Sequence, residues 1–490
     1  MVKRKFSDEM KKNAVRMVVE KSVPVTKAAR EWGISTSTLR RWVREQKSHR
    51  KLSVAEARSA PASSPAKPAG DMGTETILFD GDDIRIVASY HGSDAVVVSF
   101  SPRPQRPGDN LGGFGRDFFD GQGITGIYVV AHWANWWQSA EMEAAIEAVR
   151  KSGLVRDARH SMAYGGSMGG FGALKYAEAF ECKRALIVSP QVSIDPADIP
   201  FETRWAEDLS KLTLRDPDSR TGLGNDCQYT VIFDPFDLGD AKHVALLPKH
   251  PQLQLLSLPF CSHSPLMFFK EVGYLKTLVL KALVAQPDFA DIRSQSRKGR
   301  RGSPTYLAGV AVAANRNKHM VLACWAAGAR FDLDPASPGG FYAYARLLGA
   351  DGQYEKCVSV ADRHLEAHPG SRHGLVQRRN ALINLQRTDE ALEVAEELLR
   401  LGPDASITED DWRVHATILN RLRRGSQARR IAEAGIRRHG RTPLLLCAYI
   451  EAVYFQKDRE KFQELFAEMM ENPNITPHFK NRMQTMLERL

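Results

Sequence analysis

The pattern Gly-x-Ser-x-Gly occurs at Gly165, Ser167 and Gly169. It lies where an apolar segment, residues 160–164, gives way to a helical segment, residues 168–180. A serine at such a sharp strand-to-helix turn adopts a strained backbone conformation, which is tolerated only when the residues two before and two after it lack a Cβ. The pattern therefore predicts a strand–turn–helix unit that exposes the Ser167 hydroxyl as a nucleophile.

Segments with the apolar run of a buried strand alternate with helical segments between residues 74 and 285. The predicted strands are residues 84–89, 95–100, 126–131, 160–164, 185–189, 229–233 and 253–258. The predicted helices are residues 139–152, 168–180, 240–247 and 265–284. Strands that are buried on both faces and joined by helices favour a doubly wound, mostly parallel sheet. The turn at Ser167 falls in the middle of this series.

Two loops beyond Ser167 contain the side chains that a serine nucleophile needs. His263 follows the last predicted strand and is the expected general base. The acid is expected in the loop after the preceding strand, where Asp237 lies at the usual distance and is preferred. Asp240 is the alternative acid, and it can instead cap the following helix. Asp234 is a third choice, or only closes the strand.

Stabilising the oxyanion of an acyl intermediate requires backbone N–H donors at the same edge of the sheet. The first donor is expected from Met168, the residue after the nucleophile. The second is expected from the loop after residues 95–100, with Ser101 as the choice. Residues 196–226 form an insertion between two strands that can act as a lid and select the substrate.

Three motifs accompany this order of strands: Trp136-Trp137, Tyr164-Gly165-Gly166-Ser167-Met168-Gly169-Gly170-Phe171 and Ser189-Pro190-Gln191. With them, residues 74–285 resemble the serine α/β-hydrolase superfamily. Within it they are similar to poorly characterised bacterial hydrolases linked with glycan metabolism or accessory secretion. The resemblance implies ester or acyl chemistry on a small substrate, with no cofactor and no metal. It does not name the substrate.

The net charge of the chain is concentrated in its first fifty residues. Residues 1–51 contain 15 Lys and Arg against five Asp and Glu, a net charge of +10 that equals that of the whole protein. Residues 6–46 are predicted to form three short helices, with a tight turn at Gly33-Ile34-Ser35. The third helix presents polar and basic side chains suited to a DNA major groove. They are Thr36, Ser37, Thr38, Arg40, Arg41 and Arg44.

The runs Arg4-Lys5-Phe6-Ser7, residues 25–35 and Thr38-Leu39-Arg40-Arg41-Trp42 resemble the N-terminal helix-turn-helix of insertion-sequence transposases of the orfA type. The resemblance implies terminal-repeat DNA binding and a partner with an acidic-triad integrase domain. No such catalytic pattern follows in this chain, so only duplex DNA binding by residues 1–50 is expected. A homodimer would strengthen that binding, because isolated helix-turn-helix heads bind DNA weakly.

Residues 51–73, rich in Ala, Pro and Ser, are expected to form a flexible linker, and residues 286–304 a basic linker.

Residues 305–490 then repeat with a period of 34. Positions in phase are Pro335, Pro369 and Pro403; Ala323, Cys357 and Ala391; Ala327, Ala361 and Ala395; and Phe331, Leu365 and Leu399. The period resembles tetratricopeptide repeats, which implies a solenoid whose concave face binds a protein or peptide partner. The alternative is a helical brace that only shields the middle domain.

The six cysteines are scattered without the spacing of a metal site, which fits a reducing cytosol. No leader peptide and no run of 18 apolar residues occurs. A cytoplasmic protein without membrane contact is therefore expected.

The sequence thus predicts a multidomain chain: an all-α helix-turn-helix head, an α/β-hydrolase-like domain with a doubly wound sheet, and an all-α tetratricopeptide-like solenoid. One hypothesis is an intracellular serine hydrolase of an ester or acyl substrate, glycan-related as one option, with a DNA-binding head and protein-interaction repeats. The other is a DNA-binding regulator or transposase-derived protein whose hydrolase-like domain is a non-catalytic sensor. The complete Ser, Asp and His set favours the first hypothesis.

Overall fold

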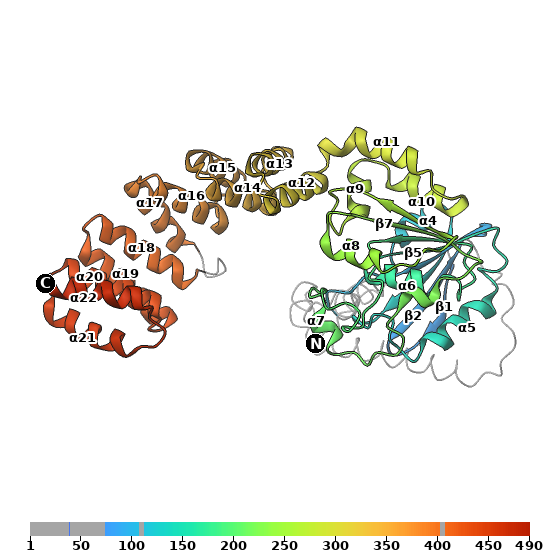
Figure 1. Ribbon diagram of the computed structural model, residues 1–490, viewed down its shortest axis with the longest axis horizontal. Helices are drawn as coiled ribbons and strands as arrows, with labels where there is room; N and C mark the ends of the chain where they lie inside the picture. Colours follow the sequence, from blue (N-terminus) through green and yellow to red (C-terminus); the bar gives the residue numbers. More distant parts are fainter. Residues whose placement is uncertain (1–38, 40–73, 107–111, 402–406) are drawn as a thin grey trace, which may run out of the picture. The chain divides into compact units, whose positions relative to one another are not determined.

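The computed structural model describes residue 39 and residues 74–106, 112–401 and 407–490. Apart from Leu39, the predicted helix-turn-helix head and the linker 51–73 lie outside these residues. The same holds for the predicted DNA-binding residues Thr36, Ser37, Thr38, Arg40, Arg41 and Arg44. From residue 74 onward, the described residues form a sheet with helices on both faces, followed by a series of helices (Figure 1).

The sheet has eight strands in the order β1-β2-β4-β3-β5-β6-β7-β8. The strands β1 and β2 pair antiparallel, as do β2 and β4, and the remaining neighbours are all parallel. This confirms the predicted mostly parallel sheet. Their bounds are β1 (Thr74–Asp80), β2 (Ile84–Tyr90), β3 (Ala95–Phe100), β4 (Thr125–Ala131), β5 (His160–Gly166), β6 (Arg184–Val188), β7 (Gln228–Phe233) and β8 (Leu253–Ser257). The sequence did not predict β1, since this edge strand is exposed or half-buried along its length and lacks an apolar run.

Helices cover both faces of the sheet and enclose two apolar cores. On one face lie α5 (Met142–Ser152), α6 (Met168–Tyr176) and α8 (Leu238–Ala245). On the other lie α4 (Arg116–Asp120), α9 (Pro265–Glu271), α10 (Leu275–Val284) and α11 (Phe289–Gly299). The predicted helix 265–284 is two helices, because Gly273 between α9 and α10 has a positive φ of 71°. The insertion contains α7 (Ala206–Leu209) and the short 3₁₀ helix η1 (Ser219–Gly222).

The C-terminal region is a solenoid in which each helix packs on the next. Its helices are α12 (Pro304–Arg316), α13 (Met320–Leu333), α14 (Pro338–Ala350), α15 (Tyr354–Ala367), α16 (Arg372–Asn384), α17 (Thr388–Arg400), α18 (Glu409–Arg421), α19 (Gly425–His439), α20 (Pro443–Phe455), α21 (Arg459–Glu471) and α22 (Pro477–Glu488). The period of 34 is confirmed in the helix starts: Ser303, Ser337 and Ser371 each cap a helix by accepting a backbone N–H. Among the described helices, none combines the length and apolar character needed to cross a membrane.

The segment expected to be a basic linker, residues 286–304, is largely helical. Asp288 caps α11 by accepting the N–H groups of Ala290 and Asp291, and Ile292 is buried against the sheet domain. A short 3₁₀ turn, η2 (Arg300–Gly302), leads into α12. Basic side chains dominate the sequence here, but one apolar anchor and a good cap suffice to fix a helix on a packed surface.

The first solenoid helix, α12, packs on the loops that follow β7 and β8. The ring of Tyr306 meets that of Phe260 edge to face at 5.8 Å. The approach at Gly309 is so close that a Cβ there would lie 2.2 Å from the carbonyl oxygen of Phe260. Arg316 donates to the carbonyl oxygen of Phe236 at 3.1 Å. The solenoid therefore supports both loops in which the sequence predicts an acid and a base.

Candidate active site

Ser167 lies at a sharp turn between β5 and α6. Its φ of 56° is positive, a strained conformation for a residue with a side chain. A Cβ at position 165 would lie 2.1 Å from the carbonyl oxygen of Gly169, and one at position 169 would lie 2.5 Å from that of Phe100. The predicted need for glycine on both sides of Ser167 is therefore confirmed. The Ser167 N–H donates to the carbonyl oxygen of Val188 at 3.0 Å, which fixes the turn against β6.

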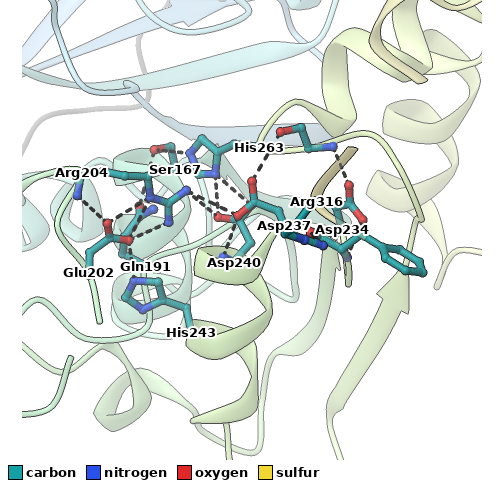
Figure 2. A network of polar contacts seen from close by, with 12 residues as sticks. Ser167, Gln191, Glu202, Arg204, Asp234, Asp237, Asp240, His243, His263 and Arg316 are labelled. Atoms are coloured by element: carbon teal, nitrogen blue, oxygen red, sulfur yellow. Dashed lines mark hydrogen bonds and ion pairs between the residues drawn. The ribbon is translucent and has the colours of Figure 1, made fainter. Parts of the chain in front are cut away.

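Ser167, His263 and Asp240 form a continuous chain of hydrogen bonds (Figure 2). His263 Nε2 lies 2.9 Å from Ser167 Oγ, and His263 Nδ1 lies 2.8 Å from both carboxylate oxygens of Asp240. Asp240 is fully buried, whereas the His263 side chain is 25% exposed. Since an ionised carboxylate only accepts, the imidazole proton belongs on Nδ1, and Nε2 is left to accept the serine proton.

Asp237, the preferred acid of the sequence analysis, does not contact His263, and that prediction is wrong. It is the N-cap of α8, where its carboxylate accepts the N–H of Asp240 at 3.1 Å. Because α8 begins at Leu238, two residues before the predicted start, Asp240 falls in the first turn and its side chain reaches His263. The roles expected for the two aspartates are thus exchanged.

The third aspartate of this loop, Asp234, joins the two loops to each other. Its buried carboxylate accepts the N–H groups of Phe236, Phe260 and Ser262 at 2.6–3.0 Å. Burial raises the pKa of this carboxyl despite these three hydrogen bonds. Asp234 therefore fixes the path of the loop that presents His263.

A buried ionic network continues from Asp240 into the insertion (Figure 2). Arg204 donates to Asp240 at 3.1 Å and also holds the buried carboxylate of Glu202 at 2.6 Å. Burial alone would raise the pKa of Asp240, but the hydrogen bond and charge of His263 and the charge of Arg204 outweigh it and lower the pKa. For Glu202, His243 and Arg204 likewise overcome burial and lower the pKa to about 2. Both carboxylates are therefore ionised near neutral pH.

His243, which the sequence analysis did not select as a site residue, completes this network. Its ring is fully buried, Nδ1 accepts the N–H of Val192 at 3.2 Å, and Nε2 lies 3.2 Å from Glu202. The backbone donor fixes the neutral tautomer with its proton on Nε2. No local pattern could reveal this, because Glu202 precedes His243 by 41 residues and comes from an irregular insertion.

The insertion, which the sequence predicts to be a lid, approaches the histidine side of the site. Trp205 lies with its ring centroid 6.2 Å from that of His263 and 5.8 Å from that of Trp136. Trp136 and Trp137 are themselves buried, and the Trp137 indole donates to the carbonyl oxygen of Met168 at 2.8 Å. The insertion thus contributes an aromatic wall beside the Ser–His pair.

Of the two predicted oxyanion donors, one is placed well and the other is not. Met168 is the first residue of α6, where no backbone acceptor exists within the helix, and no described residue accepts its N–H. The N–H of Ser101 instead donates to the carbonyl oxygen of Val129 at 2.9 Å. Pairing with β4 continues one residue past the end of β3 and occupies this donor. The assignment of Ser101 to the oxyanion is therefore wrong.

Gln191 lies beside the nucleophile. The sequence analysis identified it only as part of the motif Ser189-Pro190-Gln191. Its Oε1 is 3.4 Å from Ser167 Oγ (Figure 2). The side chain is fully buried, and its Nε2 has no hydrogen-bond partner among the described residues. An unpartnered buried amide is costly, so its place next to a serine hydroxyl marks a second polar group available to a bound molecule.

Comparison with known proteins concerns the two ends of the chain. The helix-turn-helix family model described as "Transposase" matches residues 1–69, which supports the resemblance predicted for the head and does not extend to the sheet. No curated protein matches the chain. Similar solved structures include a tetratricopeptide repeat protein from Parabacteroides merdae, with 13% identity and a TM-score of 0.34 over 38% of this chain and 74% of that one. Another is a tetratricopeptide repeat protein from Thermus thermophilus, with 14% identity and a TM-score of 0.30 over 38% of this chain and 99% of that one. A third is MamA protein, with 11% identity and a TM-score of 0.31 over 34% of this chain and 90% of that one.

Proposed function

We propose that the chain is a serine hydrolase of α/β-hydrolase type that acts on a small ester or other acyl substrate. The hydrogen-bonded series Ser167–His263–Asp240 is the observation that supports this most strongly. Its chain order and its position at the carboxyl ends of β5, β7 and β8 fit the same mechanism. The tetratricopeptide-like repeats are proposed to recruit a protein or peptide partner.

In this mechanism Ser167 Oγ attacks the acyl carbon while His263 Nε2 takes the hydroxyl proton. Asp240 keeps the imidazole in the required tautomer and stabilises the imidazolium. The N–H of Met168 and the amide of Gln191 donate to the oxyanion. The leaving group departs with the proton from His263, and a water molecule activated by the same imidazole then hydrolyses the acyl-Ser167 ester and releases the acid.

Fluorophosphonate labelling of the full-length protein tests this proposal. Wild type is expected to form one covalent adduct, located on Ser167 by peptide mass spectrometry, and Ser167→Ala to form none. Ser262→Ala is the matched control, because this serine lies next to His263 and, among the described residues, its Oγ hydrogen-bonds only to Asp237, at 3.4 Å. It should label at the wild-type rate. Failure of folded wild type to label, or equal labelling of Ser167→Ala, would reject the hydrolase.

We propose in addition that residues 1–50 bind duplex DNA, since the family model includes this segment and residues 1–51 contain the whole excess of positive charge. If the hydrolase test fails, a DNA-binding regulator with a non-catalytic sensor domain is the remaining hypothesis.

For DNA binding, the affinity of the full chain should fall steeply with salt. Arg41→Ala and Arg44→Ala should each weaken binding and reduce the slope of log K against log salt by about 1 if each contacts a phosphate. Fluorescence anisotropy with a labelled duplex measures both quantities. Arg437→Ala, in the last turn of α19, is the control and should leave both unchanged. Salt-independent or absent binding by wild type would contradict the assignment.

A further inference from the structure

A cavity of about 460 Å³ lies on the face of the sheet covered by α9 and α10. The short helix α4, of five residues, contributes Phe118 and Phe119 to its wall. Gly113 and Gly115 turn the chain into this short helix with positive φ angles of 87° and 74°. The walls are mostly aromatic and aliphatic, and include Phe114, Phe118, Phe119, Leu266, Leu275 and Val279. This volume and lining are typical of sites for small apolar ligands.

The wall of this cavity contains the hydroxyl group of Tyr164. Tyr164 is 5% exposed, and its ring stacks on Phe114 at 5.2 Å and meets Phe119 edge to face at 5.9 Å. Within the described part of the chain, no residue forms a hydrogen bond with its hydroxyl. Burial raises the pKa of this hydroxyl, so it is a donor at neutral pH. The hydroxyl oxygen is not itself enclosed by the protein, so as a donor in the cavity wall it can bind an acceptor oxygen of a ligand.

Two lysine side chains line the same cavity. Lys270, at the end of α9, and Lys276, at the start of α10, are both among its lining residues and both exposed. Neither forms an ion pair with any acid in the described ranges. The apolar walls, the hydroxyl donor and the unpaired lysines together suit a ligand with an apolar body and an acidic end.

We propose that this cavity binds the hydrocarbon chain of a carboxylate-ended amphiphile, a fatty acid or a fatty acyl group. The chain fills the space between α4 and α10, the carboxylate lies near Lys270 and Lys276, and Tyr164 donates to an oxygen of the ligand. The binding itself does not depend on catalysis by Ser167. The cavity is nevertheless close to the nucleophile's strand, because Leu266 in its wall lies 3.7 Å from where a Cβ of Gly166 would be.

Calorimetric titration of the full-length protein with dodecanoate, below its micellar concentration, tests the site. One molecule is expected to bind, with dodecylamine about tenfold weaker or worse because its charge is repelled by the lysines. The double variant Lys270→Glu/Lys276→Glu should lose about tenfold in affinity, and Tyr164→Phe about fivefold. Val279→Trp, which fills the cavity, should abolish binding. The control is Lys249→Glu/Lys457→Glu, two exposed lysines elsewhere, which should bind as wild type does.

The lysine variants change only exposed side chains, so they test the site even if Val279→Trp fails to fold. No binding of dodecanoate, equal binding of the amine, or wild-type affinity in the lysine double variant would each overturn the proposal. A second experiment, with active enzyme, distinguishes the acyl group of the substrate from a separate fatty acid as the natural ligand. Competitive inhibition of ester turnover by dodecanoate identifies the cavity as the site of the substrate's acyl group. Binding without competition, equal in wild type and Ser167→Ala, identifies a separate fatty acid.

Discussion

Replacing Asp240 by asparagine is expected to lower the rate of Ser167 labelling and of ester hydrolysis by about 10⁴-fold, the loss typical of a triad whose imidazole is held in the wrong tautomer. Asparagine has the shape of aspartate, but its amide can donate to Nδ1, which favours a proton on Nε2. That proton would face Ser167 Oγ, 2.9 Å away, and the imidazole could no longer accept from it. The second-order rate constant with a fluorophosphonate measures the effect without knowledge of the natural substrate.

Asp237→Asn is the matched control, three residues earlier in the same loop. Asparagine is as good an N-cap as aspartate, so α8 should keep its start, and the labelling rate should stay within about threefold of wild type. A large loss in Asp237→Asn together with a small one in Asp240→Asn would mean that Asp237 is the acid in solution. That pair of results would contradict the geometry described above.

The choice between these aspartates shows which features of the site could be predicted from the sequence and which could not. The alternation of apolar strands and helices predicted seven of the eight strands, and the glycines predicted the turn at Ser167. Which aspartate faces His263 depends instead on where α8 begins, and the predicted start was two residues late. Helix ends are the least certain part of any pattern-based prediction, so an assignment that depends on one is equally uncertain.

The parts of the site that were missed come from long-range contacts. Arg204 and Asp240 are 36 residues apart, and Arg204 lies in an insertion without a periodic pattern. Likewise, the N–H of Ser101 is unavailable because β4 pairs with it, and such pairing across strands leaves no mark on the sequence near residue 101. Motifs locate residues that act through local backbone geometry, whereas partners supplied by tertiary packing need the structure.

The loss of Ser101 as a donor gives Gln191 its proposed role. One N–H, that of Met168, is less than the two donors usual for an oxyanion. The Gln191 amide is completely buried, its Oε1 lies 3.4 Å from Ser167 Oγ, and its Nε2 has no hydrogen-bond partner among the described residues. A half-turn of this amide brings Nε2 to the position of Oε1, beside the carbon that Oγ attacks. With Nε2 there, the amide donates to the oxyanion, while the single hydroxyl proton of Ser167 goes to His263 Nε2.

Gln191→Leu is therefore expected to lower kcat by about 10²- to 10³-fold with KM nearly unchanged, the loss seen when a side-chain amide is removed from an oxyanion site. Leucine keeps most of the buried volume, which limits structural effects. Steady-state kinetics with a 4-nitrophenyl ester hydrolysed by wild type measure both constants. Val192→Ala, a cavity-forming change at the next and equally buried residue, is the control and should affect stability more than kcat. A kcat within about threefold of wild type for Gln191→Leu, with labelling still dependent on Ser167, would show that the second donor comes from another group.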